Sequence, residues 1–343
     1  MHSGLMRNAC YAALALGALS VTTARAQSGA NFYAGKTVRM IVSTPAGGGY
    51  DALARAVAAH LPDHIPGKPT IVVENMPGAG GIVSMNYLYK AAPKDGTVIG
   101  ALENNTPFEP LFGAKEAKFD ANAFNWLGTP STEVDVLAAW SSAPVTTYAD
   151  LKTHKLTIGS TGASSYPSIW SEILSQTLGL KLKPVVGYPG QNDVLLGMER
   201  GEVGGTFVFY NSLMTSRPAW IKDRKVKLLL QMGGEKEPKI KEVPFAADLA
   251  RTPEDKLLIE EAAAPLSIGR PYAMPPGVPA DRVAIMRKAI MATFRDPAFD
   301  AEIEKMKMEA NAIRTGAQIQ AIIARAYKTP AKVADRLRKI ANP

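Results

Sequence analysis

An apolar stretch that ends in a glycine turn and continues into a helical pattern is the feature that most limits what this chain can fold into. The stretch runs from Val38 to Val42, and a proline, three glycines and Asp51 follow it. Apolar residues then recur at helical spacing between Leu53 and Leu61. The pattern predicts a strand, a tight turn and a helix, which is the basic unit of an α/β fold.

The glycines of this turn indicate a place for an anion. Gly47, Gly48 and Gly49 have no Cβ, so another molecule can approach the backbone closely. The first amides of the following helix have no partner within it and lie at the positive end of its dipole. A carboxylate or phosphate fits there, although many such turns bind nothing. For Asp51 two roles stay open, an N-cap of the helix or a direct ligand contact.

The unit is repeated once and then followed by a third strand. Thr70–Glu74 is apolar, 75–81 is again rich in glycine, Ile82–Ala91 has helical spacing, and Thr97–Leu102 is apolar. Strands that alternate with helices predict a parallel sheet with right-handed crossovers. Ligands of such sheets bind beyond the carboxyl ends of the strands. We expect one rim there, formed by three loops: 45–51, 77–81 and 103–106.

The next part of the chain predicts a second lobe of the same architecture. Val134–Trp140 predicts a strand that crosses into this lobe. A third small-residue turn, Ser160–Tyr166, lies between the predicted strand Leu156–Gly159 and the predicted helix Ile169–Leu178. We expect this turn to face the first rim across a cleft. Further elements are predicted at Lys183–Gly187, Asp193–Arg200, Val203–Tyr210 and Val226–Gln231.

The last part of the chain predicts a return to the first lobe. Between Pro265 and Pro279, proline and glycine predict a loop and not a core strand. Amphipathic helices that pack back on the first lobe are predicted at Ala280–Phe294, Pro297–Glu309 and Gly316–Ile340. We therefore expect residues 27–135 and 268–343 to form the first lobe and residues 136–267 to form the second, with hinges near 135 and 267.

The N-terminal stretch Met1–Ala26 has the features of a cleavable signal peptide. Arg7 provides positive charge, 9–21 is apolar but too short to span a membrane, and an A-x-A pattern ends before Gln27. We expect cleavage after Ala26 and a mature protein in a bacterial periplasm. Cys10, the only cysteine of the chain, lies within this stretch, so the mature protein is expected to have neither disulfides nor thiol chemistry.

Charge and composition argue against several classes of function. The net charge is +8, but lysine and arginine are scattered and form no basic block interleaved with aromatic residues, so no nucleic acid partner is expected. The sequence has no GxSxG motif for a nucleophilic serine. His60 and His64 have the spacing of two metal ligands, but Pro62 and Pro66 interrupt the helix around them, so no metal is expected. We also expect no cofactor and no catalytic residue.

Four motifs in order resemble those of one family. Pro45–Arg55 resembles the pattern PxGGGxDxxAR, Val72–Gly81 resembles VVENxPGAGG, Lys90–Thr97 resembles KAAPxDGT, and Tyr188–Val203 resembles YxG followed by LLxGxV. These patterns are typical of the substrate-binding receptors of tripartite tricarboxylate transporters, often called the Bug or TctC family. The resemblance covers nearly the whole mature chain.

The resemblance implies a two-lobed periplasmic binding protein of the type II-like α/β class, with a ligand cleft between the lobes. It implies a monomer that closes on a small organic acid and hands it to a membrane permease with large and small subunits. Backbone amides of the first-lobe turns would hold a carboxylate, and the second lobe would hold the distal end. From the resemblance and the residues together, we expect ligand binding at Thr44, Pro45, Ala46, Gly47, Gly48, Gly49, Tyr50, Asp51, Met76, Pro77, Gly78, Ala79, Gly80, Asn104, Ser160, Thr161, Gly162, Ala163, Ser164, Ser165, Tyr188, Gly190 and Tyr210.

The sequence departs from the family pattern around the predicted ligand. Thr44 stands where relatives carry an aromatic residue, Tyr50 where they carry a small one, and Gly204 where they often carry an acid. The turn 161–165 lacks the usual histidine. A dicarboxylate, a tricarboxylate and an aromatic carboxylate therefore all stay open as ligands. Two other functions stay open as well: a periplasmic enzyme that uses Asp51, and a sensor that signals to a membrane kinase.

Overall fold

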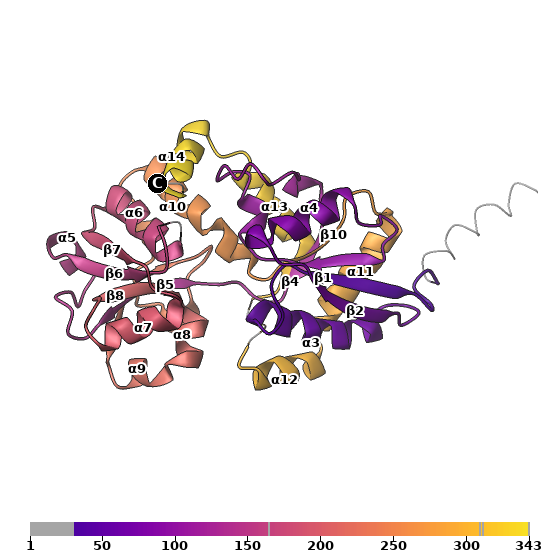
Figure 1. Ribbon diagram of the computed structural model, residues 1–343, viewed down its shortest axis with the longest axis horizontal. Helices are drawn as coiled ribbons and strands as arrows, with labels where there is room; N and C mark the ends of the chain where they lie inside the picture. Colours follow the sequence, from indigo (N-terminus) through magenta and orange to yellow (C-terminus); the bar gives the residue numbers. More distant parts are fainter. Residues whose placement is uncertain (1–30, 164, 309, 311, 342–343) are drawn as a thin grey trace, which may run out of the picture.

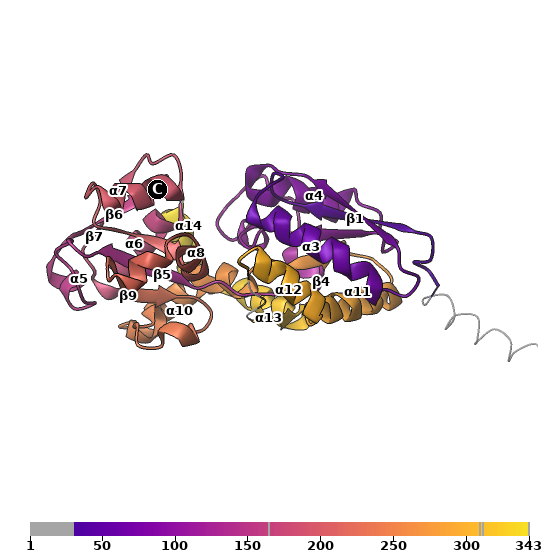
Figure 2. The ribbon, with the colours of Figure 1, turned by 90° about the horizontal axis from the view of Figure 1, so that it is seen from below.

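The computed structural model describes residues 31–163, 165–308, 310 and 312–341. Figure 1 shows two lobes side by side, each built around its own β-sheet, and Figure 2 shows the segments that connect them. The predicted signal peptide and Ser164 lie outside the described residues. Within the part that is described, no helix combines the length and the apolarity needed to cross a membrane.

The first sheet has six strands, three of which pair in parallel as the sequence predicts. β1 pairs in parallel with β2 on one side and with β3 on the other, in a register that aligns Val42 with Asn75 and with Ala101. The carboxyl ends of all three strands therefore lie at one edge. In spatial order the strands are β11 (Arg314–Thr315), β4 (Asn125–Thr129), β10 (Tyr272–Met274), β3 (Val98–Ala101), β1 (Thr37–Val42) and β2 (Thr70–Asn75).

Helices cover both faces of the first sheet. Each face of the sheet has its own apolar cluster, because side chains alternate along each strand. Met40 belongs to one cluster and Ile41 to the other. On the Met40 side lie α3 (Gly49–His64), α11 (Ala280–Thr293) and α12 (Pro297–Lys305). On the Ile41 side lie α4 (Ile82–Lys90) and α13 (Gly316–Ala326).

The second sheet has five strands and mixes parallel with antiparallel pairs. β6 pairs in parallel with β7 and β8, as a repeat of the first lobe predicts, whereas β5 pairs antiparallel with β8 and β9. The order is β7 (Leu182–Val186), β6 (Leu156–Ser160), β8 (Gly205–Phe209), β5 (Asp135–Trp140) and β9 (Val226–Met232). Its helices are α5 (Asp150–Thr153), α6 (Tyr166–Leu178), α7 (Gln191–Glu199), α8 (Tyr210–Ser216), α9 (Pro218–Lys222), α10 (Pro253–Ala263) and α14 (Ala331–Ala341).

One expectation about the core was wrong. The proline-rich return, predicted to be only a loop, contains β10, whose three residues are fully or almost fully buried between β3 and β4. Pro271 and Pro275 flank this strand, so neither proline removes a donor from within it. The carbonyl of Pro271 still accepts a hydrogen bond from the amide of Leu102 at 2.9 Å. Proline therefore bounds this short strand instead of excluding it.

The C-terminal helix was also predicted incorrectly. The pattern over 316–340 is not one helix but two, α13 and α14, separated by a turn that contains Pro330. α13 packs on the first sheet, but Val333, Leu337 and Ile340 of α14 join the apolar cluster of the second sheet with α6 and α10. The chain thus passes between the lobes three times, near 130–134, 264–271 and 327–330. The exact division into lobes remains a prediction.

Candidate ligand-binding site

The three loops that leave β1, β2 and β3 contact one another, as the parallel order predicts. Asn75 Nδ2 donates to the carbonyl of Thr44 at 3.0 Å, which joins the first two loops. Thr106 Oγ1 donates to the carbonyl of Gly80 at 2.8 Å, and the amide of Glu103 donates to Ser43 Oγ at 2.9 Å. We call these loops, 44–51, 76–81 and 103–106, the first rim.

Asp51 holds the first turn, but it is not the N-cap of α3. That position belongs to Gly48, and no side chain caps it. Asp51 lies in the first turn of the helix and reaches back, so its Oδ2 accepts from the amide of Gly47 at 2.8 Å and from Arg55 Nε at 3.0 Å. Its Oδ1 accepts from Asn75 Nδ2 at 2.8 Å. The Arg55 hydrogen bond, followed by those from Gly47 and Asn75, lowers the pKa of this buried carboxyl to about 2, although burial opposes the shift.

The N-terminus of α3 offers free donors at the surface of the first rim. The amides of Gly48, Gly49 and Tyr50 have no acceptor among the described residues, whereas the amide of Ala52 already bonds the carbonyl of Gly48 at 2.9 Å. Gly47, Gly48 and Gly49 are exposed. A Cβ placed on Gly48 would meet only the carbonyl oxygen of Pro45, at 3.9 Å. The helix dipole and these amides together favour an anion here.

Arg270 adds a cation at the same place, and sequence reasoning missed it. A Cβ on Gly49 would lie 3.8 Å from Arg270 Nη2, so the guanidinium lies against the start of α3. It is also 5.4 Å from the centre of the Tyr50 ring and 3.5 Å from Glu133 Oε1. Arg270 Nε is buried without a hydrogen-bond partner among the described residues. An arginine directly after the Ser-Ile-Gly of the return crossing is the signal that could have identified it.

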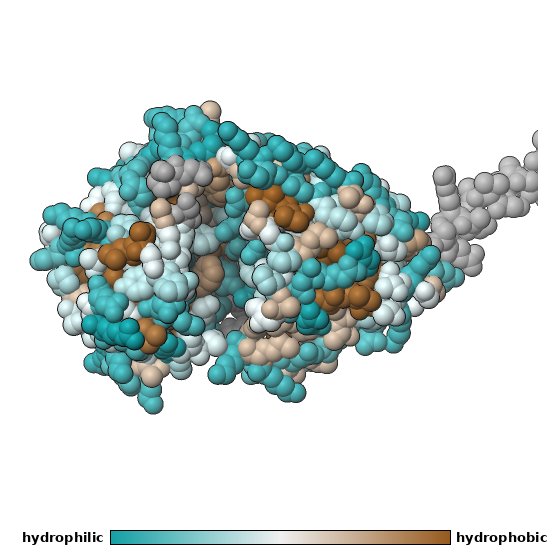
Figure 3. Space-filling view, viewed as in Figure 1, coloured by the Kyte–Doolittle hydropathy of each residue, from teal (hydrophilic) through white to brown (hydrophobic). Residues whose placement is uncertain are grey.

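A cleft between the lobes contains this cation. It encloses about 730 Å³, and Figure 3 shows the hollow between the two lobes. Among the predicted site residues, Gly49 lines it from the first lobe and Tyr210, the first residue of α8, from the second. Glu133 and Arg270 line it from the crossing segments. The site has the mixed polarity of a pocket that fixes a small charged molecule.

Two buried acids lie where the crossing segment enters β5: Glu133, which lines this cleft, and Asp135, the first residue of the strand. Burial raises the pKa of Glu133, although Arg270 opposes the shift. Burial also raises the pKa of Asp135 to about 8, and the Asp135 Oδ1 atom has no hydrogen-bond partner among the described residues. A carboxyl in such surroundings prefers its neutral form.

The second-lobe turn after β6 is held by its own hydroxyl groups. Ser160 Oγ lies 2.6 Å from Ser165 Oγ and 2.7 Å from Ser168 Oγ, and all three hydroxyls bond the carbonyl of Gly162 at 2.8 to 3.0 Å. Thr161 and Ala163 are exposed at the tip of this turn. The following residue, Tyr166, donates its hydroxyl hydrogen bond to Asn105 Oδ1 of the first lobe. The turn therefore reaches the first rim through Tyr166.

The remaining predicted residues divide into three groups. Thr44 and Asn104 are buried at the first rim, and each has a side-chain atom without a partner among the described residues, Thr44 Oγ1 and Asn104 Nδ2. The hydroxyl of Tyr50 accepts from the amide of Asn104 at 3.4 Å. Tyr188 is not brought to the cleft, because its hydroxyl donates to Glu202 Oε2 at 3.1 Å beyond the end of α7. Exposed rim residues are Pro45, Ala46, Pro77, Gly78, Ala79 and Gly80, whereas Met76 and Gly190 are partly buried.

Comparison with known proteins shows to which family this architecture belongs. A family model described as the tripartite tricarboxylate transporter family receptor matches residues 53–336. A UPF0065 protein of Bordetella pertussis is 26% identical over 197 residues, which covers 55% of this chain and 59% of that relative. The match therefore spans about three fifths of the length of this relative.

Two solved structures resemble this fold across nearly all of their length. A TctC solute-binding protein from Polaromonas has a TM-score of 0.70 at 21% identity, covering 90% of this chain and 98% of the other. An R. palustris protein solved with adipate has a TM-score of 0.59 at 18% identity, covering 89% and 97%. The two α/β lobes and the cleft between them are those of a periplasmic binding protein. More specifically, the chain belongs to the TctC, or Bug, family of solute-binding receptors.

Proposed function

We propose that this protein captures a small organic acid in the periplasm by closing its two lobes, and delivers the acid to a membrane permease with a large and a small subunit. The site binds the acid through a carboxylate, and dicarboxylates, tricarboxylates and aromatic carboxylates are the first classes to test. The receptor acts as a monomer, without a cofactor and without chemical change of the solute. The adipate in the R. palustris structure supports an organic acid as the class of ligand.

One observation supports the proposal most strongly. Three amides at the start of α3, which have no acceptor within the described part of the chain, lie beside the guanidinium of Arg270, at a cleft that the second lobe lines as well. A hydrogen bond to a charged group contributes about 1.5–3 kcal/mol, so several such donors can hold one carboxylate firmly. Because the cleft has residues of both lobes, a ligand that contacts both stabilises the closed form.

The same site offers little to an enzyme. Among the described residues, no group of three or more histidine, cysteine, aspartate or glutamate side chains is arranged to hold a metal ion. Asp51, the catalytic candidate from the sequence, is engaged by Gly47, Arg55 and Asn75 and has a lowered pKa. A carboxylate of this kind is a weak general base.

Binding is tested first by thermal unfolding of the mature protein with mono-, di- and tricarboxylates, aromatic acids, amino acids and neutral amides. A ligand at a hundred times its Kd adds about 2.7 kcal/mol, which raises the midpoint measurably. The solute is then recovered and analysed. We expect a shift with carboxylates and an unchanged solute. A new product would indicate an enzyme, and a shift with neutral amides alone would overturn the carboxylate site.

The role of Arg270 is tested by calorimetry on Arg270→Gln. The variant should bind the best acid about 10 to 100 times more weakly. Glu133 loses its cation in this variant, so the double variant with Glu133→Gln is measured as well. Arg295→Gln makes the same change of charge at an exposed position and should bind normally. Equal affinities in all variants would remove Arg270 from the site.

Delivery is tested by uptake of labelled acid into proteoliposomes that carry the large and small permease subunits. Uptake that depends on the receptor supports transport. Binding without stimulation of uptake, together with activation of a membrane kinase, would support the sensor instead.

A further inference from the structure

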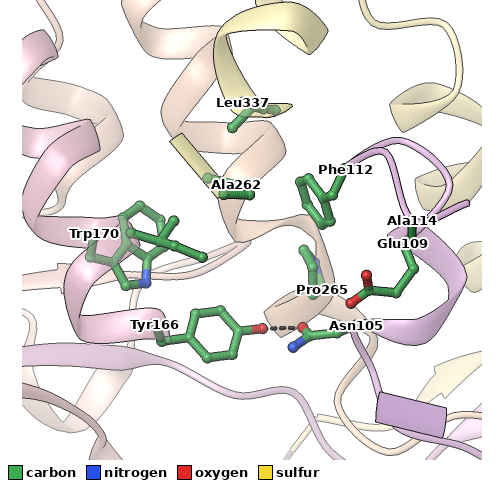
Figure 4. Close-up of a pocket in the computed structure, with 11 residues that line it drawn as sticks. Asn105, Glu109, Phe112, Ala114, Tyr166, Trp170, Ala262, Pro265 and Leu337 are labelled. Atoms are coloured by element: carbon green, nitrogen blue, oxygen red, sulfur yellow. Dashed lines mark hydrogen bonds between the residues drawn. The ribbon is translucent and has the colours of Figure 1, made fainter. Parts of the chain in front are cut away.

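A second pocket lies under the C-terminal helix, and it is lined by Asn105 of the first rim and by Tyr166, the residue after the serine turn of the second lobe. It encloses about 220 Å³, and Figure 4 shows it between the first-lobe segment after β3, the helix α6 of the second lobe, and α14 above. Phe112, Trp170 and Leu337 provide much of its apolar wall. At its polar side, the Tyr166 hydroxyl bonds Asn105 Oδ1.

This pocket adjoins both rims. Asn105 lies between Asn104, whose amide bonds Tyr50, and Thr106, whose hydroxyl bonds Gly80. Tyr166 follows directly on the serine turn of the second lobe. A ligand held at the first rim can therefore extend toward the pocket past the Asn105–Tyr166 contact.

The charge of this pocket is opposite to that of the start of α3. Glu109 is the single charged side chain among the residues that line it, and Figure 4 shows the carboxylate directed into the pocket. Within the described part of the chain, this carboxylate has neither a hydrogen bond nor an ion pair. Burial, and then the charge of Glu103, raise the pKa of Glu109. A second carboxylate of a ligand would meet Glu109 here without a counter-ion.

An amino group would meet the complementary surroundings. Glu109 and Asn105 Oδ1 offer acceptors to N–H donors. The rings of Phe112 and Trp170 line the pocket from opposite sides, and aromatic faces attract cations. The apolar residues around them suit a short hydrocarbon segment between the two ends of a ligand.

We propose that the pocket under α14 selects a ligand whose distal end carries an amino group, so that the solute is an apolar aminocarboxylate and not a dicarboxylate. This inference rests on the proposed function, because it takes the carboxylate to be bound at the first rim. It names a specificity residue, Glu109, and a wall contributed by the last helix of the chain.

The test is calorimetry with matched series of straight-chain α,ω-dicarboxylates, ω-aminocarboxylates and monocarboxylates of four to eight carbons. At the best length, the aminocarboxylate should bind at least tenfold more tightly than the dicarboxylate. Glu109→Gln should abolish this preference, so that the aminocarboxylate no longer binds more tightly than the dicarboxylate. Glu116→Gln, which makes the same change of charge at an exposed position nearby, should keep the preference. Circular dichroism and thermal unfolding of each variant establish that it is folded.

The outcomes separate the two proposals. If dicarboxylates bind more tightly than aminocarboxylates, the proposed receptor function is retained and the amino-group inference is overturned. The inference is likewise overturned if dicarboxylate binding strengthens on acidification in the wild type but not in Glu109→Gln, because a neutral Glu109 would then donate to a carboxylate. If no carboxylate of any series binds, the proposed function fails, and the inference fails with it.

Discussion

The two rims that face each other across the cleft are stabilised by different chemistry. In the first lobe, the buried and ionised Asp51 accepts hydrogen bonds from Gly47, Arg55 and Asn75 and so stabilises the glycine turn. In the second lobe, neutral hydroxyls converge on the carbonyl of Gly162. The charge of Asp51 is thus balanced by Arg55, and backbone amides of the first rim are left for a ligand. The second rim uses its own hydroxyls for structure.

The comparison extends to the two buried aspartates. Asp51 is paired and has a lowered pKa, whereas Asp135, at the start of β5, is unpaired at Oδ1 and has a raised pKa. The proposed anion site therefore lies in the first lobe, whereas the second lobe lines the cleft with neutral residues such as Tyr210 and Asn211 and with Lys239. In the proposed function, the first lobe binds the charged end of the solute and the second lobe recognises the remainder.

The largest effect is expected from blocking the amides of the first rim. Gly48 has φ −85°, which any residue adopts, and a Cβ there meets only Pro45 at 3.9 Å. Gly48→Val should therefore fold, with a change in unfolding free energy below about 1 kcal/mol, and its side chain should cover the amides. We expect the affinity to fall by about a hundredfold or more, and by less in Gly48→Ala. Calorimetry and chemical denaturation measure the two quantities; unchanged affinity would remove the first rim from the site.

Removing the charge that organises the first rim should affect stability more than binding. Asp51→Ala leaves the amide of Gly47 and the amide group of Asn75 without their acceptor, which should cost about 1–3 kcal/mol at pH 7. The folded-state pKa of Asp51 is about 2, below its unfolded value, so this contribution is present above about pH 4 and is lost as the pH falls toward 2. Denaturation across this range measures it. A large loss of affinity with little loss of stability would instead place Asp51 in contact with the ligand.

Replacing the buried aspartate of the second lobe, Asp135, is expected to raise the unfolding free energy instead of lowering it. The folded-state pKa of Asp135 is about 8, above its unfolded value, so ionisation opposes folding increasingly as the pH rises from about 4 to 8. Asp135→Asn should therefore stabilise the protein by about 1–2 kcal/mol at pH 8 and have no effect below pH 4. Denaturation at the two pH values provides the comparison. Destabilisation at pH 8 would show that Asp135 is ionised and paired.

The smallest effect is expected in the serine turn. Ser160→Ala removes the hydroxyl at the centre of the cluster and should cost about 1 kcal/mol, with a loss of affinity of a few fold as the turn loosens. Ser171 is a matched control, because it is equally buried but bonds only the carbonyl of Pro167 within α6. Ser171→Ala should lose stability and keep its affinity. Equal losses of affinity in both variants would indicate a general effect of destabilisation.

The sequence predicts the first rim well because its signals are local. Apolar runs, glycine turns and helical spacing define β1, β2, α3 and α4 within a few residues. The parallel order then places their loops together, and the hydrogen bonds of Asn75 and Thr106 confirm this contact. The predictions that failed concern elements whose structure depends on residues distant in the sequence. β10 is only three residues long and exists because β3 and β4 flank it.

The candidate site was predictable in its backbone but not in its charged side chains. The Ser-Ile-Gly before Arg270 marks the return crossing, and Glu109 follows the loop 103–106 by three residues, but neither context shows that the side chain faces a cleft. Tyr188 illustrates the same limit, since its turn position suggests ligand contact, whereas its hydroxyl donates to Glu202. Whether a side chain faces a cleft depends on packing between elements, which periodicity does not report.

The path of the final helix has a consequence for the order in which the molecule can form. The first sheet needs β10 and β11, which follow all the strands of the second sheet in sequence, and the second lobe needs α14, the last helix described. A chain made from its N-terminus therefore completes neither core until its final segment is available. The two lobes receive the last elements of their cores close together in the sequence. A chain proposed for export would thus stay incompletely folded until those elements are made, and export requires an unfolded chain.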